Sequence, residues 1–436
     1  MKKLIITITI VIFSFQLNVF AQGLNFAGNP TGTAGTGNAR TDADNLFIRN
    51  NVAGITEIPL NDEEERTGNL TSAAKGHWRF FSEGRAFIYQ HRSQTNDFAT
   101  GIPTRFESEQ TTITPNIAAE ATYTSNDHRY GFGIGTYQIV HYRSRFIEPA
   151  RFLGDQKQLF DTHISSTDIA VGGAYRLHKK LSVGGAFIFG RAFIDLKGKN
   201  FVNFNLQERI EADDFGAPGV QLGFHYRPTN YLSFAANYKS KRSYQLKGKI
   251  KNAFGSDRGH FQTGVFNSDI SLDFDLPTIA EAGLQFNPTK NLLLAFDFRF
   301  YDYSATLQGV DEFEPSKLKT PNNLEIFFPL FPFSFVSGLD VHSFHMGGKY
   351  RINDNTSINF GATITSNGIA SSQLSERIID NGNTIAFGIN KRIKDSWLLL
   401  GLGYTFRRDR PEIDSPSFFS KQFSGRGLLV SIGLRR

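Results

Sequence analysis

Apolar side chains stand at every second position along much of this chain. In 292–300, Leu or Phe occupies positions 292, 294, 296, 298 and 300. The same alternation recurs in 232–239, 357–365 and 428–435. A period of two residues is the period of a β-strand, because successive side chains of a strand point to opposite faces. The pattern predicts a chain built of strands, each with one apolar face.

Fourteen candidate strands of this kind follow one another, and the connections between them alternate in length. Short connections such as 125–129 and 392–395 hold residues typical of tight turns. An even number of antiparallel strands, with short turns at one end and long loops at the other, is the pattern of an outer-membrane β-barrel. The alternative, a soluble sandwich, would have shorter strands and no such alternation. The predicted strands are 84–93, 115–124, 130–142, 166–176, 181–197, 218–226, 231–248, 278–286, 291–304, 341–351, 356–365, 383–391, 396–407 and 425–436.

The first 21 residues have the features of a secretory signal peptide. Lys2 and Lys3 precede an apolar run, 4–15, and Ala21 ends a small-residue cleavage site. After this segment no apolar stretch approaches the roughly 20 residues of a membrane-spanning helix. The composition, with 43 Phe and 41 Gly, suits strands that face lipid on one side and a polar lumen on the other. We therefore expect a protein of the bacterial outer membrane.

The sequence offers no sign of catalysis. There is no Cys, the ten His residues lack the spacing of a metal site, and no nucleophile-elbow motif is present. The net charge of +6 is scattered along the chain, which argues against a nucleic-acid partner. We expect no catalytic residue, no metal, no cofactor and no enzymatic activity.

The segment 23–59, before the first strand, is rich in Gly, Ala, Asn and Thr and shows little alternation. Small side chains let a backbone pack closely against its surroundings. We therefore expect residues 22–75 to fold inside a barrel formed by 76–436.

Several short motifs, taken in order, resemble the FadL family of outer-membrane transporters for long-chain fatty acids and other hydrophobic compounds. The opening segment is similar to the family's N-terminal hatch, with Asn51, Val52, Ala53 and Gly54 where the family has Asn-Pro-Ala-Gly. Val52 departs from that pattern. The other motifs are Gly35–Ala39, Ala43–Asp44, Ala174–Leu177 with Leu181–Gly184, Tyr238–Ser240 with Leu246–Gly248, and Asp275–Thr278.

The resemblance implies a fourteen-strand barrel closed by the hatch, with passive uptake of a hydrophobic ligand. Extracellular loops would capture the ligand, which would leave sideways at an inward kink of the third strand. In that strand, Gly131, Gly133 and Gly135 share one face, which we assign to the lumen. Glycine within a strand marks a bend or a close approach of another backbone. The three glycines therefore predict a lateral opening, room for the hatch, or both. We expect a monomer in contact with ligand and membrane lipid.

The segment 324–335, LEIFFPLFPFSF, lies in a long connection and is unusually apolar. Its two prolines argue against a helix interior or a central strand. A large apolar patch in a loop usually marks a binding surface. The segment is a candidate for ligand capture, for a lid on the barrel mouth, or for insertion into lipid. Its apolar candidates are Phe327, Phe328, Leu330, Phe331, Phe333 and Phe335.

A fatty acid would bring a carboxylate, so a cation beside an apolar pocket is expected. By alternation Lys239, Lys241, Arg299 and Arg351 point inward, and each is also compatible with a solvated or paired residue of the lumen. Two other functions stay open. One is a water-filled porin, which the hatch-like segment disfavours. The other is a structural, adhesin or secretion-accessory barrel without transport.

Overall fold

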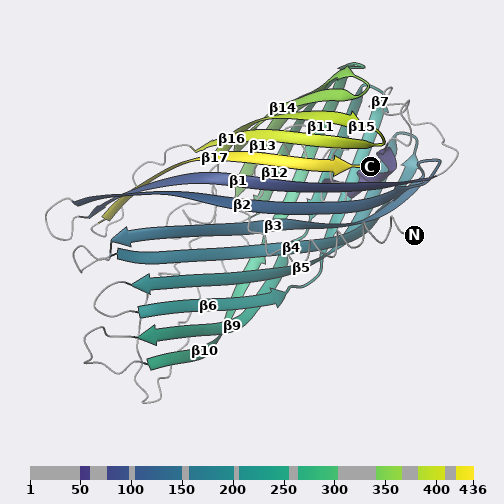
Figure 1. Ribbon diagram of the computed structural model, residues 1–436. Coiled ribbons are helices and arrows are strands. Elements are labelled where there is room, and N and C mark those ends of the chain that lie inside the picture. The colour runs from purple at the N-terminus through teal and green to yellow at the C-terminus, as the bar shows by residue number, and fades with distance from the viewer. Residues whose placement is uncertain are drawn as a thin grey trace.

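The computed structural model describes residues 50–58, 76–97, 104–149, 157–200, 206–254, 264–302, 340–365, 382–407 and 419–436. Within these ranges the chain is almost entirely antiparallel β-sheet (Figure 1). A short 3-10 helix, η1 (Val52–Glu57), precedes the first strand. In the described part of the chain, no helix is long and apolar enough to cross a membrane. The predicted signal peptide 1–21 and the Phe-rich segment 324–335 lie outside the described residues.

Fourteen strands close into one antiparallel ring, because the first strand pairs with both the second and the last. The predicted fourteen-strand barrel is thus confirmed, and two of its strands have the predicted bounds. The ring consists of β1 (His77–Asp97), β2 (Thr104–Thr124), β3 (Tyr130–Pro149), β4 (Lys157–His178), β5 (Leu181–Asn200), β7 (Gly219–Thr229), β8 (Leu232–Lys239), β11 (Thr278–Thr289), β12 (Leu292–Asp302), β13 (Val341–Asn353), β14 (Thr356–Thr365), β15 (Gly382–Ile393), β16 (Ser396–Arg407) and β17 (Phe419–Arg435).

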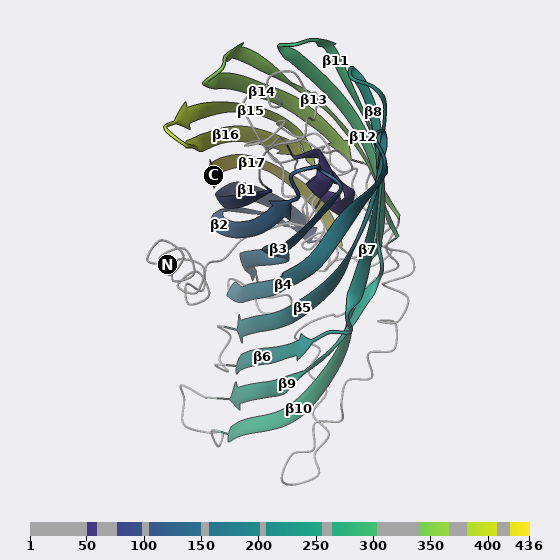
Figure 2. The same cartoon turned by 90° about the vertical axis from the view of Figure 1, so that its right-hand side faces the viewer.

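Three further strands form an extension of the wall beyond the ring. They are β6 (Leu206–Phe215), β9 (Arg242–Phe254) and β10 (Gly264–Leu276), and they pair in the order β5–β6–β9–β10. Figure 2 shows these strands splayed away from the ring. Short breaks at 216–218, 240–241 and 277 separate them from β7, β8 and β11. Pro218 and Pro277 lie in two of these breaks, and proline lacks the N–H that a continuous strand would donate.

The extension corrects part of the sequence prediction. The segments 198–217 and 249–277 were expected to be loops, yet they hold β6 and β10. The single strand expected at 231–248 is two strands, β8 and β9, with a break at 240–241. The two segments were expected to be loops because acidic residues are frequent in both: β6 contains Glu208, Glu211, Asp213 and Asp214, and β10 contains Asp269, Asp273 and Asp275.

The outer face of the wall is apolar over the ring and charged over the extension, and β5 shows both. Its outward side chains Phe187 and Phe189 are 62% and 53% exposed, as expected of a surface that meets lipid. Two residues further on, Arg191 forms an ion pair with Asp213 of β6. Lipid cannot stabilise such charges. The break between ring and extension therefore lies near the boundary of the apolar band.

Candidate functional site

The described part of the N-terminal segment, residues 50–58, lies inside the ring. Val52, Ala53 and Ile55 are fully buried, and η1 contacts β4, β5 and β7 most extensively. The sequence prediction that 22–75 folds within the barrel stays a prediction, because the structure describes only residues 50–58 of that segment.

Asn51 fixes the beginning of η1 to the wall. Its side-chain oxygen accepts a hydrogen bond from Ala53 N at 3.1 Å, which is the bond of a helix N-cap. Its amide nitrogen donates to the carbonyl oxygens of Phe224 on β7 and Ala236 on β8, at 3.1 and 3.2 Å. One buried amide therefore starts the helix and ties it to two strands.

Glycines of the wall give η1 the space it occupies. A Cβ atom on Gly184 of β5 would lie 2.7 Å from Ala53 N, and one on Gly223 of β7 would lie 2.9 Å from the same atom. A Cβ on Gly131 of β3 would collide with the side chain of Ile55. Side chains larger than hydrogen at these three positions would push η1 off the wall.

Hydroxyl groups hold the second half of η1. Thr124 of β2 donates to the carbonyl oxygen of Ile55 at 2.7 Å. Thr56 Oγ1 lies 2.9 Å from Ser182 Oγ of β5 and 3.2 Å from Ala53 O, and its single proton can be donated to either acceptor. All of these groups are buried, so the bonds satisfy polar atoms that water does not reach.

Glu57, the last residue of η1, is surrounded by cationic and polar groups of the wall. Its Oε1 lies 2.9 Å from both Arg176 Nη2 of β4 and Ser182 Oγ, and 3.7 Å from His225 Nδ1 of β7. Its Oε2 lies 3.7 Å from Arg227 Nη2. Burial alone would raise the pKa of Glu57. His225, Arg227 and Arg176 outweigh burial and hold that pKa well below 4.5.

The wall of the ring is interrupted at the seam between β2 and β3. Pairing between them runs from Thr124–Gly131 to Ala118–Tyr137, which is seven pairs. Among the described strand residues, 104–117 of β2 and 138–149 of β3 make no pairs with each other, although both segments continue as strands. We use the term seam for these two segments. In Figure 1, β2 and β3 diverge toward their long-loop ends.

Two local features place the seam. Pro115 of β2 pairs with Ala86 of β1, and a strand proline is tolerated where the opposite edge is unpaired. On β3, the register against β4 shifts between Gln138 and Val140, which places a bulge at Ile139. A bulge bends its strand and increases the local twist. Together they turn β3 away from β2 immediately beyond Tyr137.

The three glycines of β3 lie below this opening, which corrects their predicted position in it. Gly131, Gly133 and Gly135 are buried on the inner face, with Tyr130, Phe132 and Ile134 exposed outside. The ladder of β3 with β2 and with β4 is intact at all three glycines. Close packing explains Gly131, which faces Ile55, whereas Gly135 has only ordinary contacts.

A buried apolar cluster lies behind the lower end of the seam. Tyr137 and Ala118, the last residues paired across β2 and β3, belong to it. Val52 and Ile55 of η1 belong to the same cluster. The other members are Ile58, Phe81, Ala170, Ala174, Ala186, Ile188 and Leu399. A continuous apolar surface thus joins η1 to the edge of the seam.

The cations proposed as carboxylate partners differ in position. Arg299 is buried and pairs with Glu281, whereas Lys239 and Arg351 are half-buried. Lys241 is exposed and pairs with Asp275, so its predicted inward position is wrong. The break at 240–241 shifts the alternation by one residue.

The residue that the break turns inward is Arg242, which the sequence prediction missed. It is buried and pairs with Asp168 of β4, itself the direct partner of Tyr137 across β3 and β4. A regular period of two across 240–241 hides this residue, and no simple sequence signal marks the shift.

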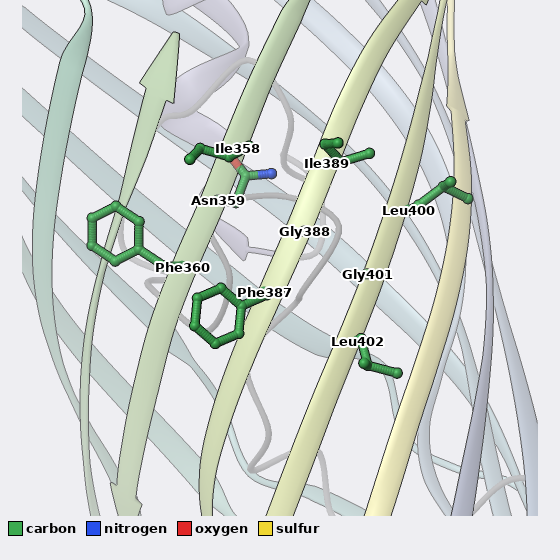
Figure 3. Close-up of a pocket in the computed structure, with 9 residues that line it drawn as sticks. All are labelled: Ile358, Asn359, Phe360, Phe387, Gly388, Ile389, Leu400, Gly401 and Leu402. Carbon is green, nitrogen blue, oxygen red and sulfur yellow. The ribbon is translucent and has the colours of Figure 1, made fainter. Parts of the chain in front are cut away.

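A groove of about 450 Å³ lies on β14, β15 and β16. Figure 3 shows the residues that line it. Phe387 and Leu402, which line it, are 65% and 54% exposed on the outer face. Gly388 pairs directly with Asn359 and with Gly401, so the ladder beneath the groove is continuous. The groove is therefore a depression between side chains on the lipid-facing surface, and the strands behind it separate it from the lumen. The lining residues are Ile358, Asn359, Phe360, Phe387, Gly388, Ile389, Leu400, Gly401 and Leu402.

The six apolar candidates of 324–335 lie outside the described residues, so their proposed role is untested. Within the described ranges, no group of three or more His, Asp or Glu side chains is arranged to hold a metal ion.

A family model described as "Outer membrane protein transport protein (OMPP1/FadL/TodX)" matches residues 22–323. Among solved structures, a Pseudomonas aeruginosa FadL homologue is 14% identical, with a TM-score of 0.68 over 96% of this chain and 99% of that one. The Pseudomonas putida toluene transporter TodX is also 14% identical, with a TM-score of 0.61 over 95% and 99% of the two chains.

The CymD monoaromatic hydrocarbon channel is similar at 14% identity, with a TM-score of 0.55 over 94% of this chain and 98% of that one. At such identity these likenesses show the fold. Among curated proteins, none matches this chain.

Proposed function

Because this chain belongs to the OMPP1/FadL/TodX family of outer-membrane transport proteins, we propose that it is a passive channel for hydrophobic small molecules, such as long-chain fatty acids or similarly apolar compounds. In this proposal η1 and its neighbouring residues act as the hatch. Ligand enters from the long-loop end, crosses the apolar cluster and leaves sideways through the seam. No energy-coupling step is required, because the ligand moves down its own gradient.

The observation that carries the proposal is the position of the seam. The β2–β3 ladder ends at Ala118 and Tyr137, and both residues belong to the apolar cluster that includes η1. An apolar molecule at that cluster has an apolar surface on one side and an unpaired stretch of wall on the other. On the unpaired part of β2, the apolar side chain of Ile113 is 61% exposed.

The hatch role of η1 is supported by how firmly it is held. Asn51 bonds two strands at one end, Glu57 meets Arg176 and His225 at the other, and Gly184 and Gly223 fit closely around the middle. A segment anchored at both ends blocks passage straight through the ring. A sideways route needs no movement of η1.

The Phe-rich segment 324–335 completes the proposal as the entrance. Exposing a large apolar side chain rather than burying it costs about 1.5–3 kcal/mol. Its six apolar side chains therefore favour contact with ligand or with the barrel mouth over water. Capture by this segment would raise the local concentration of ligand above the cluster.

A reversible lock on η1 tests the route. Thr56 Oγ1 and Ser182 Oγ are 2.9 Å apart, so Thr56→Cys with Ser182→Cys places two thiols in contact in a chain that has no other cysteine. We expect the oxidised double variant to take up a labelled long-chain fatty acid or alkane into cells as fast as its reduced form. Uptake that stops on oxidation and returns with reductant would mean that ligand passes η1 instead. Uptake no faster than in cells lacking the protein would favour a barrel without transport.

A further inference from the structure

The end of η1 meets a row of three residues on three neighbouring strands. Arg176 of β4 pairs directly with Ser182 of β5, and Ser182 pairs directly with His225 of β7. Because these pairs are direct cross-strand partners, their side chains share one level and one face of the sheet. The row forms a ready-made seat on the inner wall, with Arg227 two residues beyond His225.

Glu57 fills this seat with a single carboxylate. Arg176, Ser182 and His225 contact Oε1, and Arg227 approaches Oε2. Arg176 also donates to the carbonyl oxygen of Thr56, so it binds both the backbone of η1 and the side chain of Glu57. The Glu57 side chain is 6% exposed, and that of Arg176 is 12% exposed. Charged groups this well buried are retained when they are paired.

We propose that Glu57 is the positioning residue of the hatch. Its negative charge holds the end of η1 on the Arg176–Ser182–His225 row, and this attachment keeps the ring closed to ions. The inference rests on the proposed hatch role of η1 and adds to it the residue on which closure depends.

Charge, rather than packing, carries this attachment. Several other bonds of η1 join neutral groups: Asn51 to backbone carbonyls, Thr56 to Ser182, and Thr124 to Ile55 O. The bonds that involve a charged group all come from the wall around Glu57, including the one from Arg176 to Thr56 O. A hydrogen bond with an ionised partner is roughly twice as strong as a neutral one. Without the carboxylate, Arg176 and Arg227 would lose the negative charge that holds them beside the end of η1.

The test replaces Glu57 by its neutral isostere. Glu57→Gln keeps the size of the side chain and one acceptor oxygen, and it replaces the other carboxylate oxygen and the charge by a neutral NH₂ group. In planar bilayers we expect the time-averaged ion conductance to rise at least about tenfold. A tenfold rise corresponds to a change of about 1.4 kcal/mol in the free energy that favours the closed state. The rate of hydrophobic uptake should stay within about twofold of the parent rate, because the seam is unaltered. A twofold change is well below a tenfold change, which corresponds to about 1.4 kcal/mol.

A matched control separates this effect from a general loss of stability. Glu281→Gln neutralises a buried carboxylate of β11 whose partners are Arg299 and Asn237. We expect its conductance to equal that of the parent. Adding the oxidised Thr56→Cys/Ser182→Cys lock to Glu57→Gln should return the conductance to the parent level, because the disulfide replaces the missing attachment. A barrel weakened elsewhere would not respond to the lock.

The outcomes separate the two proposals. Conductance at the parent level in Glu57→Gln, together with an open pore after deletion of 22–75, would overturn the role of Glu57 and leave the hatch role standing. Equal conductance increases in Glu57→Gln and Glu281→Gln would overturn it as well. If deletion of 22–75 leaves a folded barrel that is still closed to ions, the hatch role itself fails, and the role of Glu57 fails with it.

Discussion

The two edges of β2 differ, although they belong to the same strand. Toward β1, every residue of β2 from Thr104 to Thr124 has a partner. Toward β3, pairing covers only Ala118–Thr124. Strand propensity cannot explain this difference, because the residues are the same. What differs is the backbone chemistry of one edge: Pro115 has no N–H to donate, and the neighbouring strand bulges at Ile139.

A second comparison is between the seam of β2 and β3 and the groove on β14–β16. The groove on β14–β16 is conspicuous on the surface, yet the ladder beneath it is unbroken. At the seam, by contrast, the ladder between β2 and β3 is absent among the described residues. A passage through a β-wall depends on backbone pairing, and outer side-chain shape is a poor guide to it.

The largest effect should come from stapling the seam. Ile117 and Gln138 are the first residues beyond the last β2–β3 pair. In the double variant Ile117→Cys with Gln138→Cys, a short bifunctional thiol reagent can join the two cysteines. We expect this cross-link to reduce uptake of a labelled hydrophobic ligand at least about tenfold, which corresponds to an increase of about 1.4 kcal/mol in the activation free energy of uptake.

Its control is Ala119→Cys with Thr136→Cys, which joins two residues that are already paired. That cross-link should leave uptake unchanged. Equal loss in both pairs would mean that the reagent harms the barrel and that the seam is not the route.

A somewhat smaller effect is expected at the entrance, which tests whether capture and exit are separate. Replacing Phe328, Phe331 and Phe333 by Ser removes apolar surface worth about 1.5–3 kcal/mol for each side chain that ligand fully buries. We expect uptake at low ligand concentration to fall several-fold and to recover at high concentration. The barrel should still assemble, as judged by heat-modifiable migration on gels. Failure to assemble would make the segment structural, and unchanged uptake at every concentration would contradict its capture role.

A moderate effect should follow from restoring the missing donor on β2. Pro115→Val supplies an N–H on the unpaired edge, and one hydrogen bond contributes about 0.5–1.5 kcal/mol. We expect uptake to fall by a few-fold as β3 is drawn toward β2, measured with the same labelled ligand. Ala119→Val, at an outward position that is already paired, is the control. An unchanged rate for Pro115→Val would show that the bulge at Ile139 alone keeps the seam open.

The smallest effect concerns pH and separates the hatch from the seam. The folded pKa of Glu57 lies well below 4.5, so the stability it contributes is fully present above its unfolded pKa and is lost as pH falls through the folded value. The groups facing it are Arg176, Ser182, His225 and Arg227. We expect conductance to stay low and constant between pH 7 and about pH 5 and to rise only in stronger acid. A rise near pH 6 would assign closure to a group other than the Glu57 carboxylate.

The sequence predicts the ring well because the ring depends on simple alternation. Each ring strand except β8 contains most of its predicted segment, and the inward face of Gly131, Gly133 and Gly135 follows from parity. Prediction fails where parity shifts. The break at 240–241 exchanges the faces of Lys241 and Arg242, and no regular period reveals it.

The seam carried a usable signal that the glycines obscured. Pro115 within an otherwise regular strand points to an unpaired edge on physical grounds. The seat of Glu57 carried no such signal, because Arg176, Ser182 and His225 are far apart in the chain and meet only through the register of three strands. Residues brought together by register are predictable once the pairing is known, and pairing is what a single sequence specifies least.

The unpaired edges of the seam also imply something about hydration. Hydrocarbon offers no hydrogen bonds, so backbone amides and carbonyls that face away from a partner strand are strongly unfavourable in the bilayer core. Free edges of β2 and β3 that reached the hydrocarbon would therefore draw water and lipid headgroups toward the seam and thin the bilayer beside it. A molecule leaving there would meet the interfacial layer of the membrane first. An amphiphile released at the seam would then already be oriented, with its polar end in the interface and its apolar tail in the hydrocarbon core.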